Sequence, residues 1–357
     1  MARRHSRYGT VLAMMTVAVG LYWGAQRWLF GPLYHVGDVR NGVALDAPLV
    51  AAVPVTLERW RVAPGIELHH FEDGAGENVL VVHGGPGFAP STPWPALHAL
   101  ASRYRFVYYH QRGAGLSTRP FVTLPKDGLF ATMQRLNVTL GLPAQVADLE
   151  RLRRMLAEER ITLVGHSFGA LIASLYAAEF PEHVRALVLV APADLIVMPS
   201  GRDDLFALIA ARLPKAKLAD FAAWRRELFD FRRLQERNET ELATHYARFT
   251  EFYSLAVGGN GMPSATALHA GGFMPMAVFS SMGQRHDWRG ALANVTAPVL
   301  VIHGGQDVQP AAGAEALAAD FPHGRFALVP AAGHFVQEQA PDAVARLIGD
   351  FLGAVPN

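Results

Sequence analysis

The feature that constrains this chain most is a serine between two glycines, at Gly165, Ser167 and Gly169. The short β-branched and aliphatic run 160–163 before it predicts a buried strand, and the apolar segment 170–176 after it predicts a helix. A strand that turns sharply into a helix needs glycines there, because residues without a Cβ let the two elements approach closely. Such a turn holds the hydroxyl at a helix N-terminus, where N–H groups stabilise negative charge. Ser167 is therefore predicted to be a nucleophile; the alternative is an exposed serine in a glycine-rich turn.

Similar apolar runs recur along the chain and indicate the fold class. Besides the strand before Ser167, the predicted strands cover 53–62, 66–71, 78–82, 106–109, 186–190, 299–302 and 326–329. Apolar residues at helical spacing lie between several of them, for example over 146–156 and 341–352. Alternating strands and helices predict an α/β fold with a mostly parallel central sheet and helices on both faces. The segment 119–141 shows no regular pattern.

The strand pattern stops between residues 193 and 290, where apolar stripes at helical spacing predict an inserted helical cap over the strand ends. We therefore expect a core made of 53–192 and 291–357, with the cap at 193–290. Residues 31–52 are rich in Gly, Pro and Val without periodicity and predict a linker.

Composition excludes several classes of protein. The 357 residues are 51% hydrophobic and 18% charged, which allows a large core and excludes global disorder. A net charge of +1 gives no electrostatic argument for a nucleic-acid partner. The absence of cysteine excludes disulfides, thiolate catalysis and cysteine-based zinc sites. The histidines show no spacing typical of metal ligands, so we expect no metal site, while the oligomeric state stays open.

The N-terminal 30 residues predict an anchoring or targeting segment. Arg3, Arg4 and Arg7 precede the uncharged run 9–26, whose length is near the minimum of about 17 residues for a spanning helix. Arginines of this kind stay on the cytoplasmic side. We expect an uncleaved membrane anchor that exports the catalytic part to a bacterial periplasm, or a cleaved signal peptide that makes the protein secreted. A buried helix of a soluble protein is the third interpretation.

The candidate partners of Ser167 follow the last two predicted strands. Asp307 and His334 lie there, in the chain order serine, aspartate, histidine. Open α/β sheets bind ligands at the carboxyl ends of their strands, so these residues are expected to meet at one edge. A serine nucleophile needs a base, and the base needs an orienting acid. His334 is predicted as the base and Asp307 as the acid, with Asp194 after the preceding strand as the alternative acid.

A glycine-rich turn at 83–87 is predicted to help stabilise the negative oxygen that forms when the serine attacks. Its glycines let backbone N–H groups approach a substrate carbonyl closely. We expect the donors of this oxyanion hole to be the backbone amides of Gly85 and Phe168. His83 is expected to hold the turn in place rather than to take part in the chemistry.

The motifs together resemble the proline iminopeptidase branch of the α/β-hydrolases. They are His-Gly-Gly-Pro-Gly, Gln-Arg-Gly-x-Gly-x-Ser, Gly-x-Ser-x-Gly, Gly-x-Asp and Gly-His, in that order, within residues 50–355. The resemblance implies the α/β-hydrolase fold and a serine hydrolase that works through an acyl-enzyme without a cofactor. It also implies an aminopeptidase that removes an N-terminal residue, often proline, from a short peptide or small amide.

The chain departs from that branch at two places. His110 stands where the branch has an aspartate, and the cap lacks the Trp-Glu pair that helps the branch bind the substrate's ammonium group. Glu227 and Glu251 are the candidates for that contact, and solvated helix carboxylates are the alternative. The same machinery would serve a carboxylesterase or a lactonase. A non-catalytic ligand-binding module on this fold is the alternative of another class.

Overall fold

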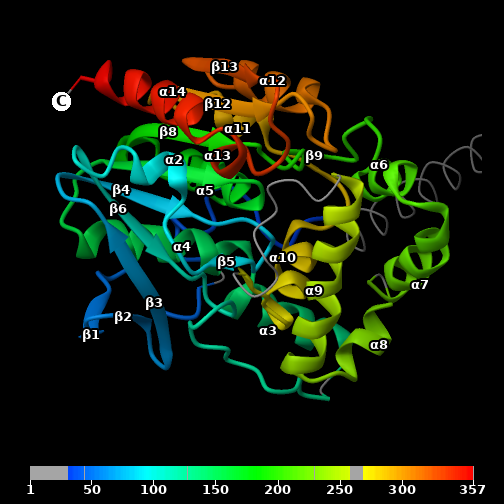
Figure 1. Ribbon diagram of the computed structural model, residues 1–357. Helices are drawn as coiled ribbons and strands as arrows, with labels where there is room; N and C mark the ends of the chain where they lie inside the picture. The colour runs from blue at the N-terminus through cyan, green and yellow to red at the C-terminus, as the bar shows by residue number, and fades with distance from the viewer. Residues whose placement is uncertain (1–30, 44, 127, 229, 258–267, 357) are drawn as a thin grey trace, which may run out of the picture.

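A nine-stranded sheet forms the centre of the molecule (Figure 1). The computed structural model describes residues 31–43, 45–126, 128–228, 230–257 and 268–356. The strand order in the sheet is β1-β2-β3-β6-β4-β7-β8-β12-β13. Neighbours from β6 to β13 are parallel, as the alternation of strands and helices predicts. The mostly parallel central sheet expected from the sequence is confirmed.

The parallel strands are continuous apolar runs because helices cover both faces of the sheet. They are β6 (Tyr104–Tyr109), β4 (Glu77–Val82), β7 (Ile161–His166), β8 (Val184–Val190), β12 (Val299–Gly304) and β13 (Gly324–Val329). Every residue of β7 and of β12 is buried. Since the strands run the same way, their carboxyl ends share one edge, and the candidate site residues follow these ends.

The antiparallel edge is made by β1 (Val53–Thr56), β2 (Arg59–Ala63) and β3 (Ile66–Asp73). The single strand expected over 53–62 is therefore two strands, because the chain reverses at Leu57, which is 97% exposed. The remaining strands form two-stranded pairs, β5 (Ala89–Pro90) with β10 (Leu268–His269) and β9 (Val197–Met198) with β11 (His286–Asp287).

Helices cover both faces of the sheet. In Figure 1, for example, α4 and α14 lie on opposite sides of it. One apolar core lies under α4 (Leu142–Met155), α5 (Phe168–Glu179), α11 (Arg289–Leu292) and α12 (Ala311–Ala319). The other lies under α2 (Pro95–His98), α13 (Val336–Gln339) and α14 (Pro341–Gly353). The two cores fix the sheet from both faces, and the loops at its carboxyl edge are left to build a site.

The inserted segment holds the helices that gather beside the sheet in Figure 1. They are α6 (Leu205–Arg212), α7 (Leu218–Leu228), α8 (Phe231–Gln235), α9 (Glu239–Ala256) and α10 (Phe273–Met282). Helix α10 packs against α3 (Leu129–Leu140), which forms where the sequence showed no regular pattern. A third apolar core joins these helices. That the segment is a separate cap domain stays a prediction.

Two expectations about the N-terminal part need correction. Residues 31–52 are not a loose linker, because Tyr34 and Val39 are fully buried and the Tyr34 hydroxyl donates to Glu179 over 3.0 Å. None of the helices in the described part of the chain is long and apolar enough to cross a membrane, so the assignment as a membrane protein is withdrawn. The expected anchor, 1–30, lies outside the described residues. Export of the folded part stays a prediction.

Candidate active site

Ser167 lies in a tight turn between β7 and α5. Its backbone angles, φ 54° and ψ −118°, fall in a region that side-chain-bearing residues rarely adopt. A Cβ on Gly169 would lie 2.1 Å from the Val82 carbonyl oxygen, and one on Gly165 would lie 2.7 Å from the Gly169 oxygen. The two glycines are thus required for the approach of α5 to the sheet, as the sequence predicted.

The predicted acid and base are hydrogen-bonded to each other. His334 Nδ1 lies 2.8 Å from Asp307 Oδ2, and the Asp307 side chain is fully buried. Burial alone would raise the pKa of Asp307, but the nearby charge and hydrogen bond of His334 lower it to about 2. Nδ1 of His334 is thus held by the carboxylate, while its proposed proton exchange with Ser167 through Nε2 stays a prediction.

The oxyanion-hole candidates lie beside the serine. Gly85, Phe168, Ser167 and His334 all line one cavity. Phe168 is the first residue of α5, where backbone N–H groups have no acceptor within the helix. A Cβ on Gly84 would come within 2.9 Å of the Ser167 Cβ, so the turn 83–87 reaches the serine itself. That the Gly85 and Phe168 amides stabilise an oxyanion stays a prediction.

His83 holds this turn through its ring. Its Nδ1 lies 3.0 Å from the Gly84 oxygen, and its Nε2 accepts from the Gln111 backbone N–H over 3.0 Å. The Gln111 side chain donates back to the His83 carbonyl over 2.8 Å. Burial lowers the pKa of His83 to about 4, so the ring is neutral in this network.

The cavity has a volume of about 750 Å³ and a largely apolar lining. Aromatic and aliphatic side chains come from the core and from the cap helices, among them Phe88, Phe130, Met133, Phe206, Phe249 and Phe279. A cavity of this size accommodates a small-molecule ligand and removes most of its surface from water. The site therefore combines a wide apolar chamber with polar groups at the serine and with charged residues elsewhere in the lining, among them Asp203 and Glu338.

The two carboxylates proposed to bind a substrate ammonium group do not line this cavity. Glu227 accepts from Arg237 Nη2 over 2.7 Å, and this ion pair lowers the pKa of its carboxyl. Glu251 accepts from Lys217 Nζ over 2.8 Å on the surface. The expectation that they contact the substrate is not supported, because both charges are paired outside the cavity.

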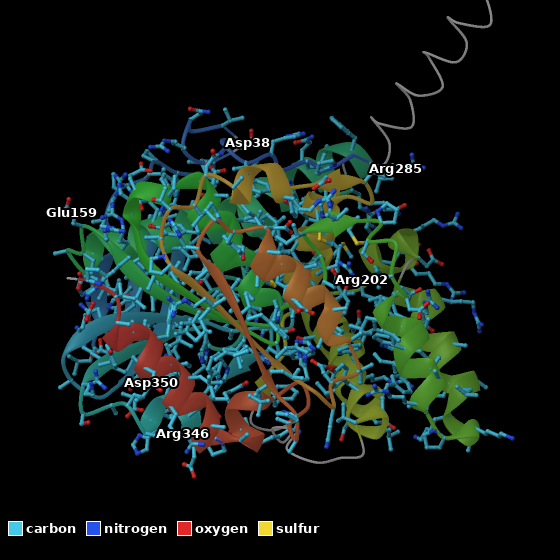
Figure 2. All side chains as sticks on the ribbon, turned by 90° about the horizontal axis from the view of Figure 1, so that it is seen from above. Asp38, Glu159, Arg202, Arg285, Arg346 and Asp350 are labelled. Carbon is cyan, nitrogen blue, oxygen red and sulfur yellow. The ribbon has the colours of Figure 1, made fainter. Side chains whose placement is uncertain are left out.

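The alternative acid, Asp194, is paired with a different residue. Both of its carboxylate oxygens accept from the Arg202 guanidinium, over 2.5 Å each. Figure 2 shows Arg202 on the side of α12 that faces the cap helices, and Gly313 of α12 lies close to Asp194. The residue hydrogen-bonded to His334 is Asp307, so the geometry favours it over Asp194 as the orienting acid.

Tyr253 and Glu338 are among the polar cavity residues that the sequence did not single out. Tyr253 of α9 donates its hydroxyl to Asp307 Oδ1 over 3.0 Å. Glu338, in the short helix after His334, lines the cavity, and burial raises the pKa of its carboxyl to about 7. Their sequence surroundings indicate only an aromatic stripe and a helix start. No group of three or more His, Asp or Glu in the described residues could hold a metal ion.

The family of the chain follows from a family model that matches residues 77–341 and is described as the alpha/beta hydrolase fold. The chain is an α/β-hydrolase. As a member of this family it is an enzyme of the hydrolase class. The match covers the sheet from β4 to β13 and spans Ser167, Asp307 and His334.

Curated relatives of this α/β-hydrolase act on different substrates. It is 27% identical to the 2-hydroxy-6-oxo-2,4-heptadienoate hydrolase of Pseudomonas putida, over 85% of this chain and 98% of that protein. It is 26% identical to haloalkane dehalogenase 2 of Mycobacterium tuberculosis, over 83% and 94%. A proline iminopeptidase of Xylella fastidiosa is 37% identical, but over only 32% of each chain.

Solved structures resemble this α/β-hydrolase in fold. A thermophilic esterase from Thermogutta terrifontis matches with a TM-score of 0.54 and 20% identity, over 82% of this chain and 95% of that one. An enol-lactonase from Burkholderia xenovorans matches with a TM-score of 0.52 and 19% identity, over 81% and 97%. At this identity the likeness concerns the fold, and the substrate has to be argued from the site.

Proposed function

We propose that this α/β-hydrolase is a serine hydrolase that cleaves carboxylic esters with a large apolar group, through an acyl-enzyme on Ser167. The observation that carries the proposal is one apolar cavity of about 750 Å³ lined by Ser167 and by His334, which is paired with Asp307. Apolar walls bind an acyl chain by removing its surface from water. A free ammonium group needs a charged partner instead, and Glu227 and Glu251 are paired elsewhere.

The proposed reaction uses the polar groups around Ser167. His334 Nε2 accepts the Ser167 proton while Oγ bonds to the ester carbon, and the carbonyl electron pair moves to oxygen. The backbone N–H groups of Gly85 and Phe168 donate to this oxyanion. When the C–O bond breaks, His334 gives the proton to the leaving alcohol. Water then repeats the sequence on the acyl-enzyme, which releases the acid and restores Ser167.

The test is a comparison of esters of increasing acyl length with the full chain. We expect kcat/KM on p-nitrophenyl esters to rise at least about tenfold from acetate to decanoate, because each buried methylene contributes about 0.8 kcal/mol. Ser167→Ala should lower the rate at least about a thousandfold without loss of fold. Equal rates at all lengths would contradict an apolar acyl site. Failure of a serine-reactive phosphonate to label Ser167 would favour the non-catalytic module.

A second candidate is the aminopeptidase that the sequence motifs imply, and Glu338 is the observation that favours it. Its carboxylate lines the cavity, and burial is the cause of its raised pKa. A substrate ammonium group would give this carboxylate the opposite charge that it needs when it is ionised. The fractional match to proline iminopeptidases agrees with this alternative.

Prolyl and alanyl anilides separate the two candidates. Turnover of these anilides, with a loss of about tenfold or more in kcat/KM for Glu338→Gln and little change on decanoyl esters, would establish the aminopeptidase. Ester turnover without anilide turnover would contradict the aminopeptidase and support the esterase. An N-acylated anilide is the matched control, because it has the same scissile bond and no ammonium group.

A further inference from the structure

The Asp307 carboxylate is held from two different parts of the molecule. Its Oδ2 faces His334 Nδ1 at 2.8 Å. Its Oδ1 accepts from the Gln309 backbone N–H over 3.1 Å and from the Tyr253 hydroxyl over 3.0 Å. His334 and Gln309 belong to loops at the sheet edge, whereas Tyr253 belongs to helix α9 of the inserted segment. The acid is therefore fixed in part by a residue outside the core.

Tyr253 is suited to this contact because its hydroxyl remains a donor. The side chain is 3% exposed, and burial together with the negative charge of Asp307 raises its pKa well above the usual value of 10. The phenol is thus protonated at any working pH. A hydrogen bond from a neutral donor to a buried carboxylate is stronger than one between two neutral groups.

A second side chain of the inserted helices holds the same loop. Arg212, the last residue of α6, donates from Nη2 to the Asp307 carbonyl over 2.9 Å and from Nη1 to the Gln306 carbonyl over 3.4 Å. Helices α6 and α9 pack against each other. The loop that carries the acid is consequently attached to two neighbouring helices of the insertion.

The Tyr253 ring also reaches the space where substrate would bind. It lines the cavity, and its centre lies 5.3 Å from the centre of the His334 ring. Phe249, one turn earlier on α9, lies 5.5 Å from Tyr253 and lines the cavity as well. An apolar group that fills the cavity therefore contacts the same face of α9 that carries Tyr253, the residue hydrogen-bonded to Asp307.

We infer that Tyr253 is a positioning residue through which the inserted helices fix the Asp307 carboxylate, and with it the orientation of His334; the inference rests on the proposed function. Asp307 orients the imidazole by accepting from Nδ1, so a carboxylate free to rotate would let the ring turn away from Ser167. Tyr253 takes up the oxygen that His334 does not use. The triad is complete only when α9 is in place against the core.

The experiment removes the Tyr253 hydroxyl and keeps the ring. We expect Tyr253→Phe to lower kcat on the decanoyl ester about tenfold and to leave KM within about twofold, because a hydrogen bond to a charged group is lost and the cavity wall stays apolar. Labelling of Ser167 by a serine-reactive phosphonate should slow by a similar factor, since it needs the same base. A merely structural role would lower thermal stability and leave both rates unchanged.

The matched control is Tyr176→Phe. Tyr176 also donates to a buried carboxylate, Glu150 Oε2, over 3.0 Å, but it is not among the residues that line the cavity. We expect it to lose stability and keep its wild-type kcat. If Tyr253→Phe keeps the wild-type kcat while Ser167→Ala is inactive, the role of Tyr253 is wrong. If Ser167→Ala keeps its activity, the proposed function itself is wrong.

Discussion

The backbone at Ser167 is strained, and hydrogen bonds from its neighbours hold it. The Ser167 N–H donates to the Val190 carbonyl over 3.0 Å, and the Ser167 carbonyl accepts from Ala193 over 3.2 Å. Both partners belong to β8 and the loop after it. The surrounding structure thus determines a φ of 54° that the residue would rarely adopt alone. These hydrogen bonds fix the backbone of Ser167, and with it the direction in which its side chain leaves the turn.

The prediction at the residue scale concerns Gly169, two residues after Ser167. Gly169→Ala would put a Cβ 2.1 Å from the carbonyl oxygen of Val82, in a central strand that cannot move away. We expect the free energy of unfolding to fall by about 2–4 kcal/mol, measured by urea denaturation. The control is Gly290→Ala in α11, where a Cβ meets nothing within 4 Å. Equal stability of the two variants would contradict the close-approach argument.

Three of the candidate site residues were predictable because each follows an apolar strand. Ser167, Asp307 and His334 come at the ends of β7, β12 and β13, and parallel strands bring such ends together. The contact of Tyr253 could not be predicted, since its partner is 54 residues away and its own aromatic surroundings indicate only burial. The sequence also could not predict whether the Glu227 side chain faces the cavity, because this depends on how its helix is oriented within the insertion.

At the scale of elements, the hydrophobic pattern did not predict helices that pack through polar residues. Helix α3 buries Thr132 and Asn137 beside its leucines, so its apolar pattern is weak. Asn137 accepts from the Ser281 hydroxyl of α10 over 2.6 Å, and this hydroxyl accepts from the Leu142 N–H over 3.0 Å. Helix α10 is buried on nearly all sides, so apolar residues occur all around it and no amphipathic periodicity appears in its sequence.

The start of α10 depends on one buried carboxylate. Glu239 accepts from the N–H groups of Gly272 and Phe273, over 2.8 Å and 2.7 Å, and from Arg119 over 2.7 Å. The residue is itself the first of α9. It therefore ties the beginnings of two helices to each other, and burial raises the pKa of its carboxyl while these donors lower it.

The element-scale prediction is that Glu239→Ala weakens this junction. We expect a loss of about 2–4 kcal/mol in the free energy of unfolding, because two buried backbone N–H groups and a guanidinium lose their acceptor. Urea denaturation measures it. Glu236→Ala, which removes an exposed carboxylate three residues earlier, should stay within about 0.5 kcal/mol of the wild type. A loss at Glu236 as large as at Glu239 would contradict the role of the junction.

At the scale of the whole molecule, the core contains histidines that burial keeps neutral. The pKa of His83 is lowered to about 4 by burial, and that of His166 to about 3 by burial and the nearby His334. Burial also lowers the pKa of His70 to about 4; its ring lies 3.4 Å from the Trp60 ring. Each of these rings would have to leave its site, or bring a charge into it, when protonated.

These histidines make stability depend on pH in one direction. Between about pH 6.5 and pH 4 these histidines bind protons in the unfolded chain but stay neutral in the folded protein. The free energy of unfolding therefore decreases as the pH falls through this window. For His83 and His166 the loss is about 2 kcal/mol each at pH 5. Glu338, with its pKa raised to about 7, acts in the opposite sense and offsets part of this loss.

We therefore expect the midpoint of urea denaturation to be lower at pH 5 than at pH 7.5, because the large pKa shifts of the three histidines outweigh that of Glu338, the carboxyl whose pKa is raised most. His70→Phe keeps a ring against Trp60 and removes Nδ1, a buried nitrogen without a hydrogen-bond partner in the structure. It should reduce the difference between the two pH values, whereas His323→Gln at an exposed position should not. Equal midpoints at pH 5 and pH 7.5 in the wild type would contradict this prediction. They would mean that the buried histidine rings take up protons in the folded protein as readily as in the unfolded chain and are charged within the fold.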